Sequence, residues 1–404
     1  MLLLTHHNRR HFFTLLSALA LTLLGCPDGA NKTSPAVSKQ DAGNRAKPPG
    51  AGTASGSATA AVATAKPSAK GASFALPPIE INSRKEIEIA GKKLKATICE
   101  LDTSAADMSG EMPFEAIRAI IAETNDSIFV LDHLGKIRKY SNVAGDKDCK
   151  LELVKKWGTA GVLTIDEKSG TSFNSLAIDK AGNLFAAGQW GGLSEGSFPA
   201  EVSRIDKAGK VKVLGCKAGG PITVDPLGTT AFIGSGGIIG KKTFDVGDGT
   251  CEPAAFSFKG WPEDSVTLVR PRGDDLLVGG FVKKKDKGKE VNVYKIALHS
   301  ADGAQKFIAG TEEGDGHICA IAEAHSCGLG LCVFDGNCQK LHAWDTSGKL
   351  VGTVSLHELV AAGSPLPAWP VAASSSADFM WLAMIADGKG DREFGFVVRI
   401  EGMN

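Results

Sequence analysis

The densest set of metal-ligating residues in this sequence lies between residues 317 and 338. The set consists of two His-x-Cys pairs and two further cysteines: His317, Cys319, His325, Cys327, Cys332 and Cys338. Because alternate residues of a β-strand point to one face, each pair would present an imidazole beside a thiol, and these donors suit zinc. The four cysteines can instead form two disulfides. We expect disulfides, because the spacing fits no zinc motif and an exported chain meets an oxidising compartment.

Export is indicated by the first 26 residues. Arg9 and Arg10 precede an apolar run of 14 residues, Phe12–Gly25. This run is too short for a bilayer core of about 30 Å, which needs roughly 20 apolar residues. It ends in Leu-Leu-Gly-Cys at Cys26, which resembles the lipobox of bacterial lipoproteins. The resemblance implies that residues 1–25 are a signal peptide and that Cys26 is acylated with fatty acids such as palmitate.

The resemblance also implies a location in the bacterial cell envelope. Two or three acyl chains anchor a protein firmly in a membrane. Pro27 stands where the inner-membrane retention signal of enterobacterial lipoproteins has Asp, which implies the outer membrane, on its periplasmic or its surface side. The Arg9–Arg10 pair before Phe12 resembles a twin-arginine export signal, and the general export route stays open.

Residues 26–72 form a low-complexity tether after the signal. They are mostly Ala, Gly, Ser, Thr, Pro and Lys, with almost no large apolar side chain. Such a segment cannot bury enough surface to offset its chain entropy, so we expect it to be disordered. A flexible chain of this length spans about 35–40 Å on average.

Composition excludes several classes of protein. The 404 residues carry 45 basic and 45 acidic side chains, so no overall charge favours nucleic acid as a partner. Apolar residues make up 43% of the chain, which is enough for a core, and 49 glycines indicate many tight turns. Collagen, coiled coil, polytopic membrane protein and a wholly disordered chain are excluded.

A turn motif, Asp-x-x-Gly, recurs through residues 73–404, which we expect to be the folded part. Its five copies are Asp132–Gly135, Asp179–Gly182, Asp206–Gly209, Asp225–Gly228 and Asp345–Gly348. Asp bonds to the backbone two residues on and Gly adopts positive φ, so each copy suits a hairpin turn. Short β-rich runs such as Ser127–Leu131 and Leu276–Gly280 lie beside these turns or between them. The class is therefore all-β.

The repeat period predicts the architecture. Apolar strands that could open each unit begin near Glu115, Asn174, Pro221, Ser265, His317 and Pro370. These positions are 44–59 residues apart, long enough for four strands, and four-stranded units of about 40–50 residues are typical of β-propellers. The chain resembles that superfamily at the level of pattern, which implies six blades. Seven are possible if residues 142–170 contain extra strands.

Closure of the ring can also be predicted. The last unit has only three strands before the chain ends, whereas Lys85–Glu100 is an isolated strand-like stretch before the first unit. We expect this N-terminal stretch to complete the sixth blade, so that the ring closes by pairing the N- and C-terminal strands and no interface is left open. The alternative is a hairpin packed on the side of the disc.

Eight cysteines follow Cys26, and an even number in an exported chain indicates disulfides. Cys216–Cys251 would bracket the third unit, and Cys99–Cys149 would join the N-terminal stretch to the first. Eight cysteines allow 105 pairings, so the spacing alone does not fix the rest.

Propellers place ligands at the central channel, where the innermost strands begin. The candidate residues at these positions are Glu115, Asn174, Asp264, Asp315 and His317. Six-bladed lactonases ring Ca²⁺ with Glu, Asn and Asp at similar positions, which at fold level implies a metal-dependent hydrolase with Ca²⁺ or Zn²⁺ as the alternative function. No P-loop, G-x-S-x-G elbow or H-E-x-x-H motif is present.

The function favoured by the sequence is therefore binding or scaffolding at the envelope, with no cofactor and no confident catalytic residue. Trp190 and Trp369 lie in Gly- or Pro-rich segments and could present a flat surface to a sugar or a peptide. We expect a protein or glycan partner, together with the membrane that the lipid anchor reaches. A structural component of a larger envelope assembly is a third class, which predicts proteins that co-purify.

Overall fold

The structure is a computed structural model. It describes residues 84–102, 117–132, 135–145, 148–165, 172–190, 198–235, 238–245, 250–254, 256, 258–259, 261, 265–286, 288–356, 368–376, 378–387 and 393–403. The expected signal peptide, Cys26 and the tether lie outside these residues. Within the described part, no helix is long and apolar enough to cross a membrane.

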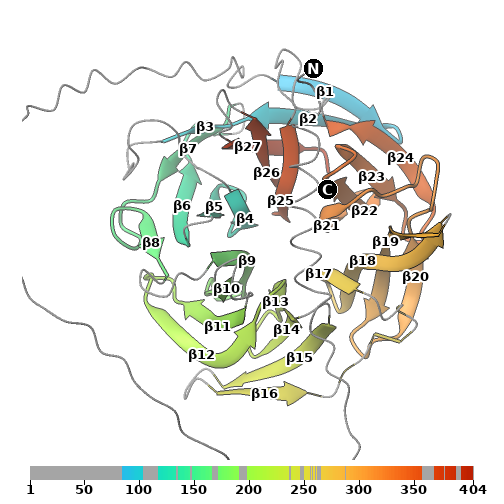
Figure 1. The fold of residues 1–404 in the computed structure, drawn as a ribbon. Helices are drawn as coiled ribbons and strands as arrows, with labels where there is room; N and C mark the ends of the chain where they lie inside the picture. The colour runs from blue at the N-terminus through green and yellow to red at the C-terminus, as the bar shows by residue number, and fades with distance from the viewer. Residues whose placement is uncertain are drawn as a thin grey trace, which may run out of the picture.

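The described strands form six antiparallel sheets arranged as blades around a central axis (Figure 1). Four of the sheets have four described strands, the first blade has six and the last has five. The fold is the predicted six-bladed β-propeller. A seventh blade is absent from the described part, because β7 and β8, the strands found within residues 142–170, both belong to the first sheet.

The first three blades run from the innermost strand outward in chain order. Blade 1 contains β4 (Ile117–Ala122), β5 (Ser127–Asp132), β6 (Lys136–Asn142), β7 (Lys150–Leu153), β8 (Val162–Thr164) and, parallel to β7, β3 (Glu100–Leu101). Blade 2 contains β9 (Ser172–Ile178), β10 (Leu184–Trp190), β11 (Phe198–Ile205) and β12 (Val211–Ala218). Blade 3 contains β13 (Ile222–Val224), β14 (Thr230–Ser235), β15 (Ile238–Asp245) and β16 (Thr250–Ala254).

The last blade departs from simple chain order. Blade 4 contains β17 (Ser265–Arg272), β18 (Asp275–Asp286), β19 (Lys289–Ser300) and β20 (Gln305–Ala309). Blade 5 contains β21 (Ile321–Cys327), β22 (Gly330–Asp335), β23 (Lys340–Trp344) and β24 (Leu350–Ser355). Blade 6 contains β25 (Ala368–Ser375), β26 (Phe379–Asp387), β27 (Glu393–Glu401), β2 (Lys92–Ile98) and β1 (Arg84–Ile89).

All five Asp-x-x-Gly motifs form hairpin turns between neighbouring strands. In each motif the Gly N–H donates to the Asp carbonyl and the Gly has positive φ, as at Gly182, where φ is 81°. The Asp carboxylate also accepts the N–H of the residue four positions on, for example Asn183 N to Asp179 Oδ1 at 2.8 Å. The sequence predicted a hydrogen bond from the N–H two residues after the Asp to its carboxylate. This bond is present at Asp206 and Asp345.

The hydrophobic core lies between the blades. Each of the six buried clusters joins the strands of two neighbouring blades, and the cluster between blades 6 and 1 includes Trp381 and Ile117. This arrangement follows from the sequence, since inner strands such as SIFVL are apolar on both faces and each face must meet another sheet. Each blade is therefore stabilised mainly by its neighbours.

The N-terminal strands close the ring. β2 pairs antiparallel with β27, with Lys95 opposite Glu401 and Ile98 opposite Val398, and β1 pairs in turn with β2. The stretch expected to complete the sixth blade therefore does so, and it is not a hairpin packed on the side of the disc. β1 becomes the outermost strand of this blade, so the described chain begins at the rim (Figure 1).

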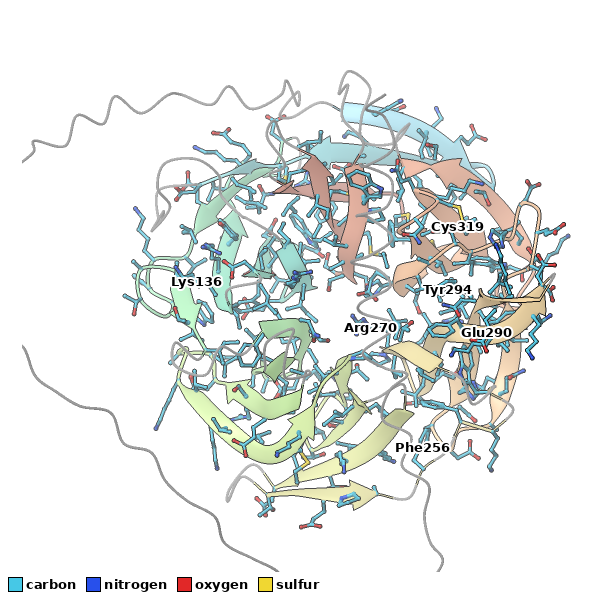
Figure 2. All side chains as sticks on the ribbon, viewed as in Figure 1. Lys136, Phe256, Arg270, Glu290, Tyr294 and Cys319 are labelled. Atoms are coloured by element: carbon cyan, nitrogen blue, oxygen red, sulfur yellow. A yellow bond between two sulfur atoms is a disulfide. The ribbon has the colours of Figure 1, made fainter. Side chains whose placement is uncertain are left out.

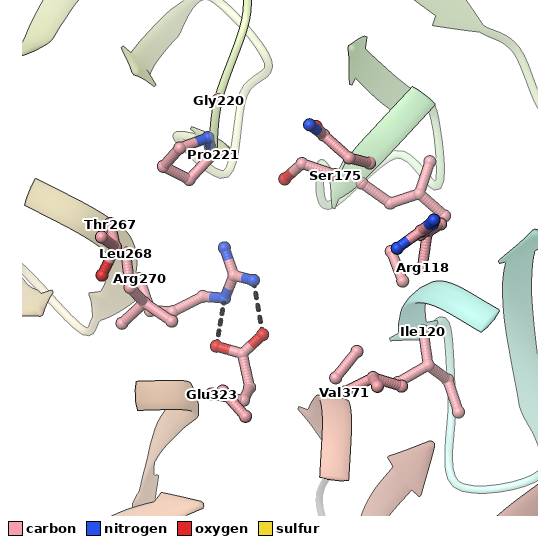
Figure 3. Close-up of a pocket in the computed structure, with 15 residues that line it drawn as sticks. Arg118, Ile120, Ser175, Gly220, Pro221, Thr267, Leu268, Arg270, Glu323 and Val371 are labelled. Atoms are coloured by element: carbon pink, nitrogen blue, oxygen red, sulfur yellow. Dashed lines mark hydrogen bonds and ion pairs between the residues drawn. The ribbon is translucent and has the colours of Figure 1, made fainter. Parts of the chain in front are cut away.

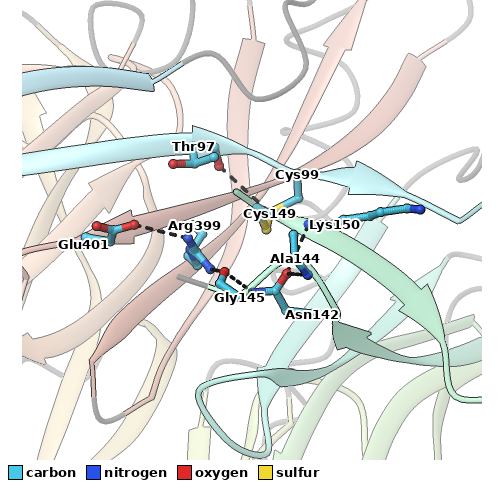
Figure 4. Close-up of a disulfide and its surroundings, with 9 residues drawn as sticks. All are labelled: Thr97, Cys99, Asn142, Ala144, Gly145, Cys149, Lys150, Arg399 and Glu401. Atoms are coloured by element: carbon cyan, nitrogen blue, oxygen red, sulfur yellow. Dashed lines mark hydrogen bonds and ion pairs between the residues drawn. A yellow bond between two sulfur atoms is a disulfide. The ribbon is translucent and has the colours of Figure 1, made fainter. Parts of the chain in front are cut away.

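A disulfide and a buried arginine fasten this closed blade to blade 1 (Figure 4). Cys99, just after β2, is bonded to Cys149, just before β7. Arg399 of β27 is fully buried, and its guanidinium donates to the carbonyl of Gly145 at 3.2 Å and to Glu401 at 3.2 Å. The last and first blades are thus joined covalently and through polar contacts.

The other three disulfides brace individual parts of the ring. Cys216–Cys251 joins β12 of blade 2 to β16 of blade 3, so the predicted pair exists but links the outer strands of two blades. Cys319–Cys338 and Cys327–Cys332 lie in blade 5 and its entry loop. The two disulfides expected in this region are confirmed.

Removal of the ring-closing disulfide should destabilise the protein more than removal of a local one. Chain entropy gives about 4 kcal/mol for a loop of the length between Cys99 and Cys149, and about 2 kcal/mol for the short Cys327–Cys332 loop. We expect C99A/C149A to lower the free energy of unfolding in urea by more than C327A/C332A does. Equal losses of unfolding free energy in the two variants would contradict this dependence on loop length.

Candidate functional site

A cavity of about 240 Å³ lies on the axis of the ring, where the innermost strands meet. Every blade contributes to its wall: residues come from β4, β9, β17, β21 and β25, and from Gly220 and Pro221 just before β13 (Figure 3). Arg270, one of the residues of this wall, lies near the centre of the disc, whereas Glu290 lies at the rim (Figure 2). The cavity is the place where side chains from all six repeats come together.

A bidentate ion pair spans two blades in the cavity wall. Arg270 of β17 donates from Nε to Glu323 Oε1 at 3.0 Å and from Nη2 to Oε2 at 2.6 Å (Figure 3). Glu323 of β21 is buried, with 3% of its side chain exposed. The planar guanidinium matches the carboxylate with two parallel bonds, so the pair is specific in direction as well as strong. The positive charge of Arg270 and the negative charge of Glu323 therefore neutralise each other.

His325 lies two residues after Glu323, so the two side chains are on the same face of β21. Its Nε2 is 2.7 Å from the carbonyl oxygen of Ala373 on β25 and 3.7 Å from Glu323 Oε1. Burial lowers the pKa of His325 below its ordinary value of 6.5, and the nearby Arg270 lowers it further, against the opposing effect of Glu323. A neutral imidazole that donates from Nε2 to Ala373 therefore joins blade 5 to blade 6 at neutral pH.

The opposite side of the cavity carries two polar side chains from neighbouring blades. Arg118 of β4 lies across the cavity from Arg270 (Figure 3), and Asn174 is on β9. Both are exposed, and neither has a hydrogen-bond or ion-pair partner within the part of the chain that the structure describes. Ser175 is different, because its hydroxyl already accepts the N–H of Ile222 at 3.1 Å.

The structure brings only one of the predicted channel residues into the cavity. Asn174 lines it, whereas Glu115 and Asp264 lie outside the described residues. Asp315 and His317 belong to the loop between β20 and β21 and do not line the cavity. This loop lies against the outer strand of blade 5: the Asp315 carbonyl accepts a hydrogen bond from Thr353 of β24 at 3.2 Å.

The described part of the cavity wall does not resemble a calcium site. Ca²⁺ takes six to eight oxygen ligands, mostly carboxylates and carbonyls. Glu323 is the one carboxylate among the described lining residues, and Arg270 occupies both of its oxygens. Arg118 adds a further positive charge, which opposes a bound cation. These residues give the metal-dependent hydrolase no support.

The His–Cys cluster does not present free thiols either. Cys319 and Cys338 lie with Asp335 within 4.8 Å of one another, but their sulfurs are joined to each other. Asp335 is fully buried and accepts the backbone N–H groups of Cys319 at 2.7 Å and Cys338 at 3.0 Å. The hydrogen bonds that it receives lower its pKa, although burial opposes them. The cluster thus holds the entry loop of blade 5 to the β22–β23 turn.

Sequence analysis missed Arg118, Arg270 and Glu323. A signal for them existed, since each is a charged residue within a short, largely apolar segment that forms an innermost strand: IRAIIA, SVTLVRPR and IAEAHSC. An innermost strand faces two neighbouring blades and the axis, so a charged residue in it must face the axis or be paired. The candidates predicted from the sequence lie instead near the positions where the strands begin.

The comparisons with known proteins bear on the fold only. The sequence matches no family model and no curated protein. Among solved structures, the chain is similar to a protein of unknown function from Dyadobacter fermentans DSM 18053, with 12% identity and a TM-score of 0.45 over 79% of this chain and 99% of that one.

The chain is also similar to two further solved structures. The WD40 β-propeller domain of Doa1 has 12% identity and a TM-score of 0.39, over 72% of this chain and 93% of that one. U3-55K has 11% identity and a TM-score of 0.41, over 71% and 95%. At this level of identity no activity is carried over.

Breaking the Arg270–Glu323 pair should destabilise the ring. Glu323→Gln leaves a guanidinium without its carboxylate, and loss of one partner of a buried charge pair costs about 2–5 kcal/mol. We expect the double variant R270M/E323M to lose less, because it removes both charges. Urea unfolding of the two variants checks this order, and a greater loss in the double variant would contradict it.

Stability should fall as the pH falls below about 6.5. Burial lowers the pKa of His325 and of His299, a fully buried residue of β19, so both histidines take up protons more readily when unfolded. The stability that they contribute is complete above the unfolded value of 6.5 and is lost towards their folded values, by at most about 1.4 kcal/mol per pH unit for each. We expect H325Q and H299Q each to flatten the dependence measured by urea unfolding between pH 7 and pH 5. An unchanged slope in both variants would contradict this account.

Proposed function

We propose that this chain is a lipid-anchored binding or scaffolding protein of a bacterial envelope, held to the membrane through Cys26, with the outer membrane as its site. The observation that carries the proposal is the closed six-bladed propeller with a cavity on its axis. A closed propeller leaves only short edges, at the outer strands of its blades, so it presents stable faces to partners.

The position of the first described residue supports an anchored role. β1 is the outermost strand of blade 6, so the residues before Arg84 join the propeller at its rim and not at the axis. An anchor attached there does not obstruct the cavity. The tether expected from the sequence would separate the propeller from the membrane by a few nanometres.

The chemistry of the cavity supports binding more than catalysis. The Arg270–Glu323 pair is already matched and His325 is turned to a backbone carbonyl, so these groups position one another. A protein or glycan partner in the envelope fits the faces of the disc. Trp369, one of two expected platform residues, lies half-buried on β25, and the side chain of Trp190 lies outside the described residues.

Metabolic labelling tests the anchor. The full chain is produced in a Gram-negative host grown with radiolabelled palmitate, beside Cys26→Ser and the control Ser34→Ala, which changes a residue of the same segment. We expect the wild-type chain and S34A to carry label and to partition into detergent, because fatty acyl chains add about 0.8 kcal/mol per buried methylene. C26S should carry no label. An unlabelled wild-type chain, or labelled C26S, would overturn the anchor.

A further inference from the structure

The central cavity carries one positive charge that the described residues do not balance. Arg118 and Arg270 contribute two positive charges, and Glu323 contributes one negative charge that both of its oxygens commit to Arg270. His325 stands behind the pair as a hydrogen-bond donor to Ala373. The guanidinium that remains available is that of Arg118, which offers a planar set of N–H donors.

Asn174 adds a second unused polar group on the same side. It comes from β9, the inner strand next to β4, and it has no partner within the described part of the chain. The nearby hydroxyl groups are already engaged, Ser175 with Ile222 and Thr267 with the carbonyl of Gly279. An amide and a guanidinium on adjacent strands can therefore both turn to a ligand.

The rest of the wall is apolar. Ile120, Leu176, Leu268 and Val371 contribute side chains around these polar groups. Small-molecule sites commonly combine such apolar walls with a few polar groups that fix the orientation of the ligand. A volume of about 240 Å³ suits a small group.

From these features we infer that the cavity binds a monoanionic carboxylate with a short apolar or amide-bearing substituent, its carboxylate on Arg118. One unbalanced guanidinium matches one carboxylate in charge and in planar geometry, whereas phosphate brings more negative charge than the cavity balances. The Asn174 amide would hydrogen-bond the group next to the carboxylate. The ligand is a free short acid or the C-terminus of a peptide, which share this chemistry. The inference rests on the proposed binding function and names its ligand class.

Calorimetry with the full chain in detergent tests the inference. The probes are N-acetylalanine, N-acetylalanine amide, N-acetyl-trialanine with a free C-terminus, and inorganic phosphate. We expect the wild-type chain to bind a carboxylate probe at least tenfold more tightly than the amide and more tightly than phosphate. Preference for the tripeptide identifies a peptide C-terminus, and equal binding of the two acids identifies a free short acid, so either result supports the site.

Variants locate the site. Arg118→Gln should weaken carboxylate binding at least tenfold, because a hydrogen-bonded charge pair is lost, and Asn174→Ala should weaken it about threefold. The matched control, Arg272→Gln, removes the same charge at the end of β17, outside the cavity. It should leave binding unchanged. Thermal unfolding shows whether each variant is folded, and the comparison of acid with amide needs no variant.

Several results of these binding experiments would contradict the inference. Amide binding as tight as carboxylate binding, tighter phosphate binding, unchanged affinity in R118Q, or no binding of any probe would overturn the inference. Palmitate labelling of Cys26 is independent of these results. If labelling persists without ligand binding, only the ligand site fails, whereas binding without labelling removes only the anchor.

Discussion

The antiparallel pairing of β2 with β27 is the interaction on which the ring depends. It joins residues that lie about 300 positions apart, such as Lys95 and Glu401, and it turns two edges that would be open into one continuous sheet. Without it, blade 6 would end at β27 and expose a row of unpaired backbone groups. The Cys99–Cys149 disulfide and the buried Arg399 then fix this blade against blade 1, so closure and packing support each other.

Ring closure also creates the cavity. Because the six hydrophobic clusters lie between blades, each inner strand packs against its neighbours on both sides, and a cavity lined by the inner strands remains on the axis. Charged residues in inner strands therefore either pair there, as Arg270 does with Glu323, or remain exposed to the cavity, as Arg118 does. The pair links blades 4 and 5, and His325 links blades 5 and 6.

The two arginines of the cavity illustrate how context decides the role of a charge. Arg270 donates to both carboxylate oxygens of Glu323 on the next blade, so it contributes to the ring. Arg118 lies across the cavity from it and has no hydrogen-bond or ion-pair partner among the described residues (Figure 3). This asymmetry favours an anion over the cation that the sequence suggested as an alternative. Of the candidates in the entry loop, Asp315 lies instead against blade 5, and His317 contacts the carbonyl of Thr311 within the loop.

The all-β class and a count of six repeats, with seven left open, could be predicted from the sequence, because the Asp-x-x-Gly turns and the apolar runs are local signals that act within a few residues. The N-terminal closure and two disulfides could also be predicted from the sequence. The observations behind these predictions are an isolated strand-like stretch, a last unit that lacks one strand, and an even number of cysteines. The tertiary structure alone decided the chemistry of the axis. Whether Arg118, Arg270 or Glu323 is paired depends on which residue of another blade faces it, and that depends on the stagger of strands far apart in the chain. For the same reason Cys216–Cys251 joins two blades, because its partners meet only when blades 2 and 3 pack together.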